Sequence, residues 1–242
     1  MQCLIIAAGQ GSRLRSRAAS KPLARIADRP LIEHVIRRAQ AGGASSFVVV
    51  TGYSAEGIEE FLAGLPAAED LPIRCMRNEE WLKPNGHSVL AAADVLADEF
   101  LLVMSDHLVD PAIVAASIAA PRRGALVLAV DQNVDSPLID LDDATKVVSD
   151  EDGRIVRLGK ALTDYDAIDT GVFRSGQLLI EAIRESVAAG GQGSLSEGVQ
   201  RLADRGLAFT IDVSGSWWLD VDDPRALELA EEQLGSGAKE LI

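Results

Sequence analysis

Leu4–Ile36 reads LIIAAGQGSRLRSRAASKPLARIADRPLIEHVI, and this stretch decides the fold. It opens with a short apolar run, Leu4–Ala8, of the kind found in strands that are buried on both faces of a parallel sheet. A loop with two glycines follows, and apolar residues then recur at helical spacing over Leu31–Ala39 until Gly42-Gly43. The order of strand, loop and helix predicts the first unit of an α/β fold.

The same alternation of strands and helices continues through the first half of the chain. Further apolar strands are predicted at 47–50, 73–76, 100–104 and 125–130, and helices at 55–65, 88–96 and 111–119. Strands that are apolar throughout indicate a mostly parallel sheet with helices on both faces. We therefore expect a Rossmann-like three-layer α/β sandwich.

The second half begins with a hairpin signal. Short strands at 146–148 and 154–156 flank Asp152-Gly153, a dipeptide typical of tight β-hairpins. Later strands are predicted at 167–173, 209–213 and 217–219, with helices ending at 186 and covering 195–203 and 224–234. The simplest arrangement is one domain over residues 1–242, in which the hairpin region forms a lid or a substrate-binding extension.

Composition and charge exclude several classes of protein. The 242 residues are 48% hydrophobic, which supports a sizeable core and rules out wholesale disorder. A net charge of −14 argues against a nucleic-acid partner and against docking on an anionic membrane. No apolar run approaches the roughly 20 residues of a membrane span, and the N-terminus does not have the order of a signal peptide. The two cysteines, Cys3 and Cys75, lie in strand-like segments, so we expect reduced thiols and a cytoplasmic protein.

The loop after the first strand suits a phosphate. Gly9 and Gly11 let backbone N–H groups approach an anion closely, although a tight turn is the alternative. A dinucleotide fingerprint needs glycine where Leu14 stands, and a P-loop needs Gly-Lys-Ser/Thr, so neither motif is present. The loop instead runs on through a series of cations, Arg13, Arg15, Arg17 and Lys21. Glycines followed by cations favour the triphosphate of a nucleotide.

Leu4–Ile36 resembles the opening signature of the nucleotidyltransferases that activate sugar and alcohol phosphates. That signature is an apolar strand, Ala-Ala-Gly-x-Gly-Ser/Thr-Arg-Leu/Met, then Lys-Pro-Leu and a helix. Later segments are similar to the CTP:inositol-1-phosphate cytidylyltransferase family, namely NEEWLKPNGHSVLAA (Asn78–Ala92), LLVMSDHLVDP (Leu101–Pro111), Gly153–Phe173 and Trp217–Pro224. The resemblance covers nearly the whole chain.

The resemblance implies a nucleotidyltransferase fold with a nucleotide-binding core at 1–130 and an acceptor-binding half at 131–242. The implied reaction is Mg²⁺-dependent, and it makes CDP-inositol and pyrophosphate from CTP and inositol-1-phosphate. In many archaeal members this domain is fused to a membrane phosphotransferase. We expect no membrane insertion here, and any downstream transferase to be a separate chain.

Carboxylates follow two of the predicted strands. Asp106 comes directly after strand 100–104, at the sheet edge where ligands bind, and it can either hold Mg²⁺ or cap a turn. By resemblance Asp106 is the first metal ligand. The second comes from WWLDVDDP, where Asp220 aligns with the family's Trp-x-Asp and is slightly preferred over Asp222. Two residues apart, Asp220 and Asp222 share a face if this segment is extended.

The chemistry needs charge neutralisation and alignment rather than a general base. A phosphate monoester has a second pKa of about 6, so it is already largely anionic at neutral pH. We expect in-line attack by the acceptor phosphate on the α-phosphorus of CTP. By resemblance Arg13 and Lys21 hold the triphosphate, and Lys160 binds the acceptor phosphate, with a solvated strand-end lysine as the alternative for Lys160.

The resemblance also implies further contacts with each substrate. The expected nucleotide contacts are Ala7, Ala8, Gly9, Gly11, Ser12, Gly86 and Ser88, with Asn78 and Glu79 as further candidates. The acceptor pocket is expected to include Asp169, Thr170 and Gly171. Asp169 either accepts hydrogen bonds from ring hydroxyls or ends a strand, and His107 either contacts the acceptor or is structural.

Other activities stay open at this point. The same transfer can use phosphocholine, an aminoalkylphosphonate or a sugar-1-phosphate as acceptor, or UTP as donor. Selection of CTP rests on the resemblance alone. A catalytically inactive nucleotide-binding subunit is a different class, and the presence of Arg13, Lys21 and Asp106 argues against it.

Overall fold

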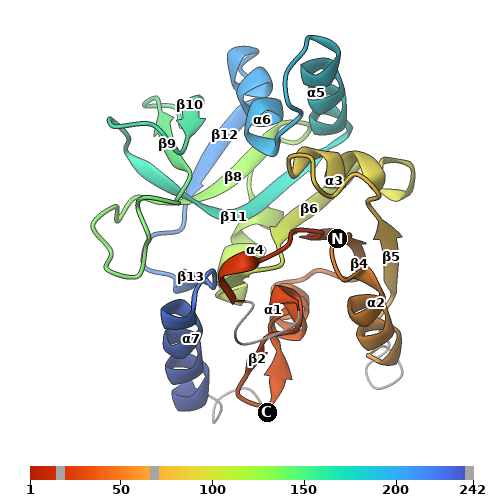
Figure 1. The fold of residues 1–242 in the computed structure, drawn as a ribbon. Helices are drawn as coiled ribbons and strands as arrows, with labels where there is room; N and C mark the ends of the chain where they lie inside the picture. The colour runs from red at the N-terminus through yellow and green to blue at the C-terminus, as the bar shows by residue number, and fades with distance from the viewer. Residues whose placement is uncertain (15–19, 66–70, 238–242) are drawn as a thin grey trace.

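A nine-stranded sheet runs through the structure, a computed structural model that describes residues 1–14, 20–65 and 71–237 (Figure 1). Arg15 and Arg17 of the basic loop lie outside these residues. Parallel strands in the order β6-β1-β4-β5 form one side of the sheet. They are β1 (Gln2–Ala7), β4 (Ser46–Thr51), β5 (Ile73–Arg77) and β6 (Glu99–Met104).

The second half of the chain extends the same sheet. Strand β11 (Ala167–Gly176) runs antiparallel to β6 and also to β8 (Leu126–Asp131). Strand β8 pairs in parallel with β12 (Ala208–Asp212). The predicted hairpin is formed by β9 (Lys146–Ser149) and β10 (Ile155–Gly159), and β9 pairs with the start of β11. The hairpin is thus a continuation of the sheet.

Helices cover both faces of the sheet, because apolar side chains of the central strands point alternately to two cores. On β1, Cys3 and Ile5 face one core, and Leu4 and Ile6 face the other. The first core is covered by α1 (Leu31–Ala41), α2 (Ala55–Gly64), α4 (Pro111–Ala119) and α7 (Pro224–Gly237). The second is covered by α3 (Gly86–Ala91), α5 (Gln177–Ala188) and α6 (Leu195–Asp204). The predicted three-layer α/β sandwich is confirmed.

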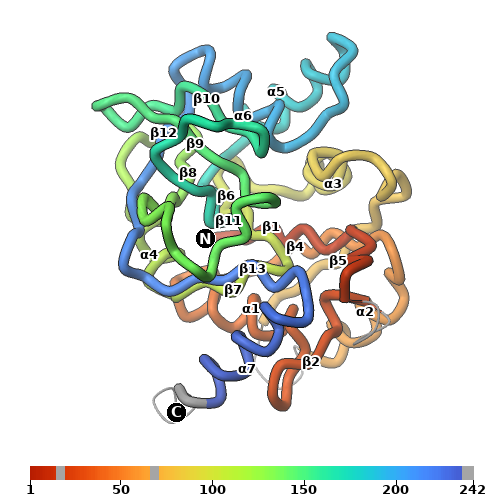
Figure 2. The backbone as a smooth tube through the Cα atoms, turned by 60° about the vertical axis from the view of Figure 1, so that its left-hand side comes forward, coloured from red at the N-terminus to blue at the C-terminus, as the bar shows by residue number. Residues whose placement is uncertain are grey.

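Two small antiparallel pairs complete the strands. One joins β2 (Arg25–Ile26) to β3 (Arg29–Pro30), and the other joins β7 (His107–Val109) to β13 (Trp218–Asp220). Figure 2 shows β7 and β13 together, with α7 following β13. The β7–β13 pair holds residues 218–220 next to the end of β6, more than 100 residues earlier in the sequence. Within the described ranges, no helix is long and apolar enough to cross a membrane.

Candidate active site

Two cavities open at the carboxyl ends of β1 and β6, the edge where open parallel sheets bind ligands. Their volumes are about 640 Å³ and about 320 Å³. They share four lining residues, which are Asn85, Met104, Asp106 and Asp222. The two cavities therefore adjoin at a pair of carboxylates.

The smaller cavity is built around the glycine loop. Its lining includes most of the residues expected to bind the nucleotide, namely Ala8, Gly9, Gly11, Ser12, Arg13, Lys21 and Ser88. Gly11 has a φ of +55°, and a side chain there would bring its Cβ within 2.3 Å of the Cβ of Lys21. Glycine is needed at this position both for the backbone conformation and for the close passage of Lys21.

Four of the expected nucleotide-binding residues do not line this cavity, namely Ala7, Asn78, Glu79 and Gly86. Ala7 is buried inside β1, against the core on one face. Asn78 is also buried, and its Nδ2 donates to Ser88 Oγ at 3.1 Å, so it positions Ser88. Gly86 packs against the backbone, since a Cβ there would lie 2.2 Å from the carbonyl oxygen of Gly193. A role of these four residues in nucleotide binding stays a prediction.

Lys21 connects the glycine loop to the carboxylates. Its side chain is only 7% exposed, its Nζ lies 2.6 Å from Asp106 Oδ2, and it also pairs with Asp222 Oδ1. Arg13 Nη2 lies 2.6 Å from the other oxygen of Asp222. Although burial alone would raise the pKa of Asp106, Lys21 and His107 hold that pKa below its ordinary value. Asp106 and Asp222 are thus paired with the cations predicted to hold phosphate.

On the other side of Asp106 lie His107 and Asp220. The β7–β13 register places His107 opposite Asp220, and the backbone N–H of Val221 donates to the carbonyl of Asp106 at 2.9 Å. His107 Nε2 is 3.8 Å from Asp106 Oδ1 and 3.6 Å from Asp220 Oδ2. An extended chain would put Asp220 and Asp222 on one face. Instead β13 ends at Asp220, so Asp220 faces His107 and Asp222 faces Lys21.

These carboxylates fit a divalent cation. Asp106 Oδ1 and Asp220 Oδ1 are both buried and accept no hydrogen bond from the described residues. Burial and the charge of Asp106 raise the pKa of Asp220 against the opposing effect of His107. Burial alone would lower the pKa of His107, but Asp220, Asp106 and Asp169 raise it. Buried carboxylate oxygens without donors are suitable ligands for Mg²⁺, which prefers oxygen.

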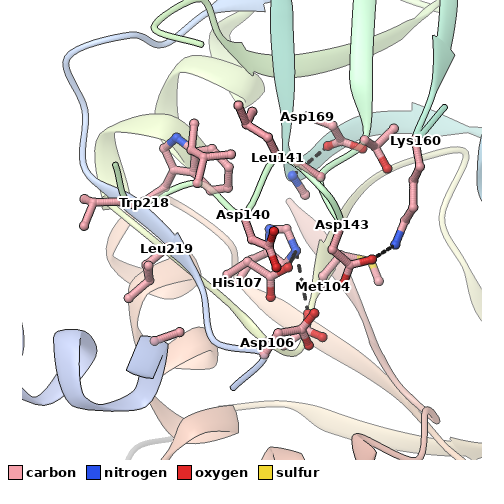
Figure 3. A pocket seen from close by; sticks show the side chains of 18 of the residues that line it. Met104, Asp106, His107, Asp140, Leu141, Asp143, Lys160, Asp169, Trp218 and Leu219 are labelled. Carbon is pink, nitrogen blue, oxygen red and sulfur yellow. Dashed lines mark hydrogen bonds and ion pairs between the residues drawn. The ribbon is translucent and has the colours of Figure 1, made fainter. Parts of the chain in front are cut away.

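Lys160 lines the larger cavity, as expected for an acceptor-binding lysine, but it is not free. It forms an ion pair with Asp143 (Figure 3). Asp143 also pairs with Arg13. Hydrogen bonds from Lys160 and then Arg13 lower the pKa of Asp143 to about 2. Asp143 was not predicted from the sequence, because it lies in the acidic loop between β8 and β9, which has no periodic pattern.

The acceptor-side triplet Asp169-Thr170-Gly171 has three different roles. Asp169 and Gly171 line the larger cavity, and Asp169 Oδ1 accepts a hydrogen bond from the Gly171 N–H at 2.7 Å. Thr170 is buried, and its Oγ1 donates to the carbonyl of Ala129 at 2.9 Å. Gly171 has a φ of +79°, and a side chain there would collide with the imidazole of His107. Thr170 therefore supports the pocket from behind, whereas Asp169 faces into it.

Replacing Asp169 with asparagine is expected to stabilise the protein at neutral pH. Burial raises the pKa of Asp169 from 3.8 to about 6. A raised carboxyl pKa means that stability decreases as pH rises from about 4 to about 6, because the folded state holds the proton more tightly. Asparagine keeps the acceptor for Gly171 without the charge, so the variant should gain about 2–3 kcal/mol at pH 7. Urea unfolding measured from pH 4 to 7 checks this, and a gain of the same size at pH 4 would contradict it.

Glycine-loop amides and cations on one side, with carboxylates at the sheet edge on the other, are suited to phosphoryl chemistry on a nucleotide. The fold and the site together are those of a nucleotidyltransferase. A family model described as the MobA-like NTP transferase domain matches residues 3–161. The chain belongs to this family.

Individual relatives agree with the predicted resemblance to inositol-1-phosphate cytidylyltransferases. Two proteins named bifunctional IPC transferase and DIPP synthase, from Rubrobacter xylanophilus and Aquifex aeolicus, are 37% and 31% identical over 95% and 96% of this chain. The chain spans about half of their length, 51% in each case. The structure of the inositol-1-phosphate CTP transferase from T. maritima matches with a TM-score of 0.86 at 25% identity, covering 100% of this chain and 97% of that one. A UDP-glucose pyrophosphorylase complexed with UDP-glucose, at 16% identity and a TM-score of 0.79 over 98% of both chains, shares the fold.

Proposed function

We propose that this protein transfers a cytidylyl group from CTP to inositol-1-phosphate and releases pyrophosphate. The observation that carries the proposal is the meeting of the two cavities at Asp106 and Asp222. Apart from Asp222, residues of 1–130 line the smaller cavity, and most of the larger one comes from 131–242. We assign the nucleotide to the first and the acceptor to the second, so that the reacting phosphates meet at the shared carboxylates.

Arg13, Lys21 and the backbone N–H groups of Gly9–Ser12 are assigned to the triphosphate. The two cations are paired with carboxylates, as described above. Binding of the triphosphate exchanges these partners for phosphate oxygens. As pyrophosphate leaves, the same two side chains stabilise its developing negative charge.

Mg²⁺ would be held by Asp106 together with Asp222, since both carboxylates line the smaller cavity and already share one cationic nitrogen, Nζ of Lys21. The ion supplies neutralisation of the α-phosphate charge, which favours attack by another anion. Asp220, the residue preferred from the alignment with Trp-x-Asp, lines only the larger cavity. Its buried Oδ1, which has no donor among the described residues, makes Asp220 the other candidate ligand of the ion.

Lys160 is assigned to the acceptor phosphate, and Asp169 and Asp140 to hydroxyl groups of the acceptor. All three line the larger cavity, where carboxylates are good acceptors for ring hydroxyls. The acceptor phosphate needs no general base, because it is already largely anionic at neutral pH. Alignment of that phosphate with the α-phosphorus is the main contribution of the protein.

Replacing Asp143 with asparagine should lower the KM for the acceptor by about fivefold, since a partly exposed ion pair contributes up to about 1 kcal/mol. Asp143 pairs with Lys160 and Arg13 and so competes with a substrate phosphate for them. Steady-state kinetics of pyrophosphate release measure the change. Asp142→Asn is the matched control, because Asp142 lines the same cavity. An unchanged or higher KM for Asp143→Asn would contradict the assignment of Lys160.

The substrate assignment is tested with a matrix of nucleotides and acceptors. CTP, UTP, ATP and GTP are each combined with inositol-1-phosphate, phosphocholine, aminoethylphosphonate and glucose-1-phosphate, and products are identified by mass spectrometry. We expect the highest kcat/KM for CTP with inositol-1-phosphate. A higher value for another pair reassigns the substrate, and CTP binding without turnover of any pair favours an inactive nucleotide-binding subunit.

The wider context follows from the proposed product. A CDP-alcohol is an activated donor, so we expect a phosphotransferase, which acts at a membrane in the family that this chain resembles, to consume it. A cytoplasmic location and the absence of a nucleic-acid partner stay predictions from charge and composition.

A further inference from the structure

The segments that begin α3 and α6 are held together beside the two cavities. Asn85 Oδ1 accepts a hydrogen bond from the backbone N–H of Leu195 at 2.9 Å. The next residue, Gly86, packs so closely on this segment that a Cβ there would lie 2.2 Å from the carbonyl oxygen of Gly193. These two contacts fix the backbone of Asn85 and the position of its side-chain amide.

The contact with Leu195 also fixes which way the amide of Asn85 is turned. A side-chain amide has one oxygen, which accepts, and one NH₂ group, which only donates. Because the Leu195 N–H is a donor, the amide oxygen faces it and the NH₂ group lies on the other branch of the amide. Nδ2 donates to none of the described residues, and Asn85 is exposed. Two N–H donors of fixed orientation are therefore available to a ligand.

Asn85 lies where the two cavities meet. It lines both of them, together with Met104, Asp106 and Asp222. Of these four shared residues in the described part of the chain, Asn85 alone can donate from its side chain at neutral pH, since a thioether and ionised carboxylates only accept. Phosphate oxygens need donors. The junction therefore offers one neutral donor at the place where the proposed function brings the reacting phosphates together.

A neutral amide differs from the cations of the smaller cavity in one respect. Lys21 and Arg13 are paired with carboxylates, and a phosphate must displace those partners. The NH₂ group of Asn85 has no such partner among the described residues, so a phosphate oxygen can bind it without breaking an ion pair. A preorganised donor of this kind stabilises charge that develops in a transition state.

We propose that Asn85 is a further catalytic residue, whose Nδ2 donates to an oxygen of the α-phosphate during transfer. The inference rests on the proposed function. In that reaction a bond forms between the acceptor phosphate oxygen and the α-phosphorus, and the bond from phosphorus to the pyrophosphate oxygen breaks. Pyrophosphate leaves with the electron pair, and no proton has to move. Asn85 stabilises the negative charge on the transferred group while its Oδ1 stays on Leu195.

Two substitutions separate this role from a purely structural one. Asn85→Asp and Asn85→Ala both remove the donor, but only Asn85→Asp keeps an oxygen for the Leu195 N–H. We expect kcat to fall by about a hundredfold or more in both variants, as for the loss of one preorganised donor in other enzymes. Hydrogen exchange of the Leu195 amide, followed by NMR, should stay slow in Asn85→Asp and become faster in Asn85→Ala.

Each alternative predicts a different pattern. If Asn85 only held α6 in place, Asn85→Asp would restore both the slow exchange and the activity. If Asn85→Asp acted only by adding a negative charge, Asn85→Ala would keep the wild-type kcat. Either result would overturn the proposal. Asn133→Asp is the matched control, because it makes the same change on an exposed residue that lines neither cavity, and its kcat should be that of the wild type.

A second measurement needs no turnover. In the ¹⁵N-labelled protein, the Nδ2 signal of Asn85 is identified by its absence from Asn85→Asp. The α,β-methylene analogues of CTP, UTP, ATP and GTP, which keep the α-phosphate but do not release pyrophosphate, are added with Mg²⁺. We expect this signal to shift with the analogue of the donor nucleotide, CTP. Absence of a shift with all four analogues would refute the contact.

Failure of this inference and failure of the proposed function give different results. An active enzyme whose Asn85 signal does not shift refutes only the role of Asn85. A shift of the Asn85 signal in a protein that turns over no substrate pair supports the contact with the nucleotide and refutes the proposed transfer.

Discussion

Asp106→Asn is expected to lower kcat/KM by at least about a thousandfold, comparable to the loss of a principal charge-stabilising group in other enzymes. Asparagine has nearly the same size, so the fold and the Val221 contact to the Asp106 backbone should persist. The substitution removes a charge at the point where the two cavities meet. Binding of the ion assigned to the α-phosphate depends on the Asp106 charge, and so does the position of Lys21.

Pyrophosphate release under saturating Mg²⁺ measures the loss. Asp142→Asn is the matched control, since it makes the same change elsewhere in the lining of the larger cavity. Thermal unfolding of both variants should show similar, intact folds. Normal turnover by Asp106→Asn would disprove the metal assignment and the arrangement built on it.

Lys21→Met should lower both the stability of the protein and its activity, and it should make the Tm more responsive to Mg²⁺. It removes the cation between Asp106 and Asp222, and because Lys21 is only 7% exposed, we expect a loss of stability of about 2 kcal/mol. It also removes the side chain that we propose contacts the leaving pyrophosphate, so kcat/KM should fall by about a hundredfold or more. The remaining carboxylates should then bind Mg²⁺ more readily, so that added Mg²⁺ raises the Tm of the variant more than that of the wild type.

Tm measured against Mg²⁺ concentration, together with the kinetics, distinguishes these effects. Lys83→Met is the control, because Lys83 lines the same cavity but is half exposed and pairs with Glu80. A variant whose Tm responds to Mg²⁺ no more than the wild type would show that Asp106 and Asp222 do not act as a pair.

The fold could be predicted because its main strands are recognisable in the sequence as apolar runs. Apolar runs such as Phe100–Met104 are long enough to be recognised, and both of their faces are buried in helix-covered cores. Strand β7 was missed because its three residues include His107 and show no pattern. Its partner β13 was predicted, but only the structure shows that the two pair.

The site was predictable where a loop follows a strand and not where contacts cross the fold. Gly9, Lys21 and Asp106 lie next to recognisable strands or motifs, and the structure brings them together. Asp143 pairs with Arg13 and Lys160, which lie in other segments of the chain, and no local sequence pattern reveals these contacts. Gly86 packs closely against Gly193, and this contact with a distant segment is likewise not visible in the local sequence.

With Arg13 on the donor and Lys160 on the acceptor, as proposed, the bridge from Arg13 through Asp143 to Lys160 links the affinities of the two substrates. The first phosphate to bind must displace the Asp143 carboxylate from Arg13 or Lys160. The Asp143 carboxylate then holds the other cation less firmly, so the second phosphate binds that cation more easily. Donor and acceptor should accordingly bind with synergy, each strengthening the other by the same factor, as thermodynamic reciprocity requires. Removal of the bridging carboxylate should make the two binding events independent.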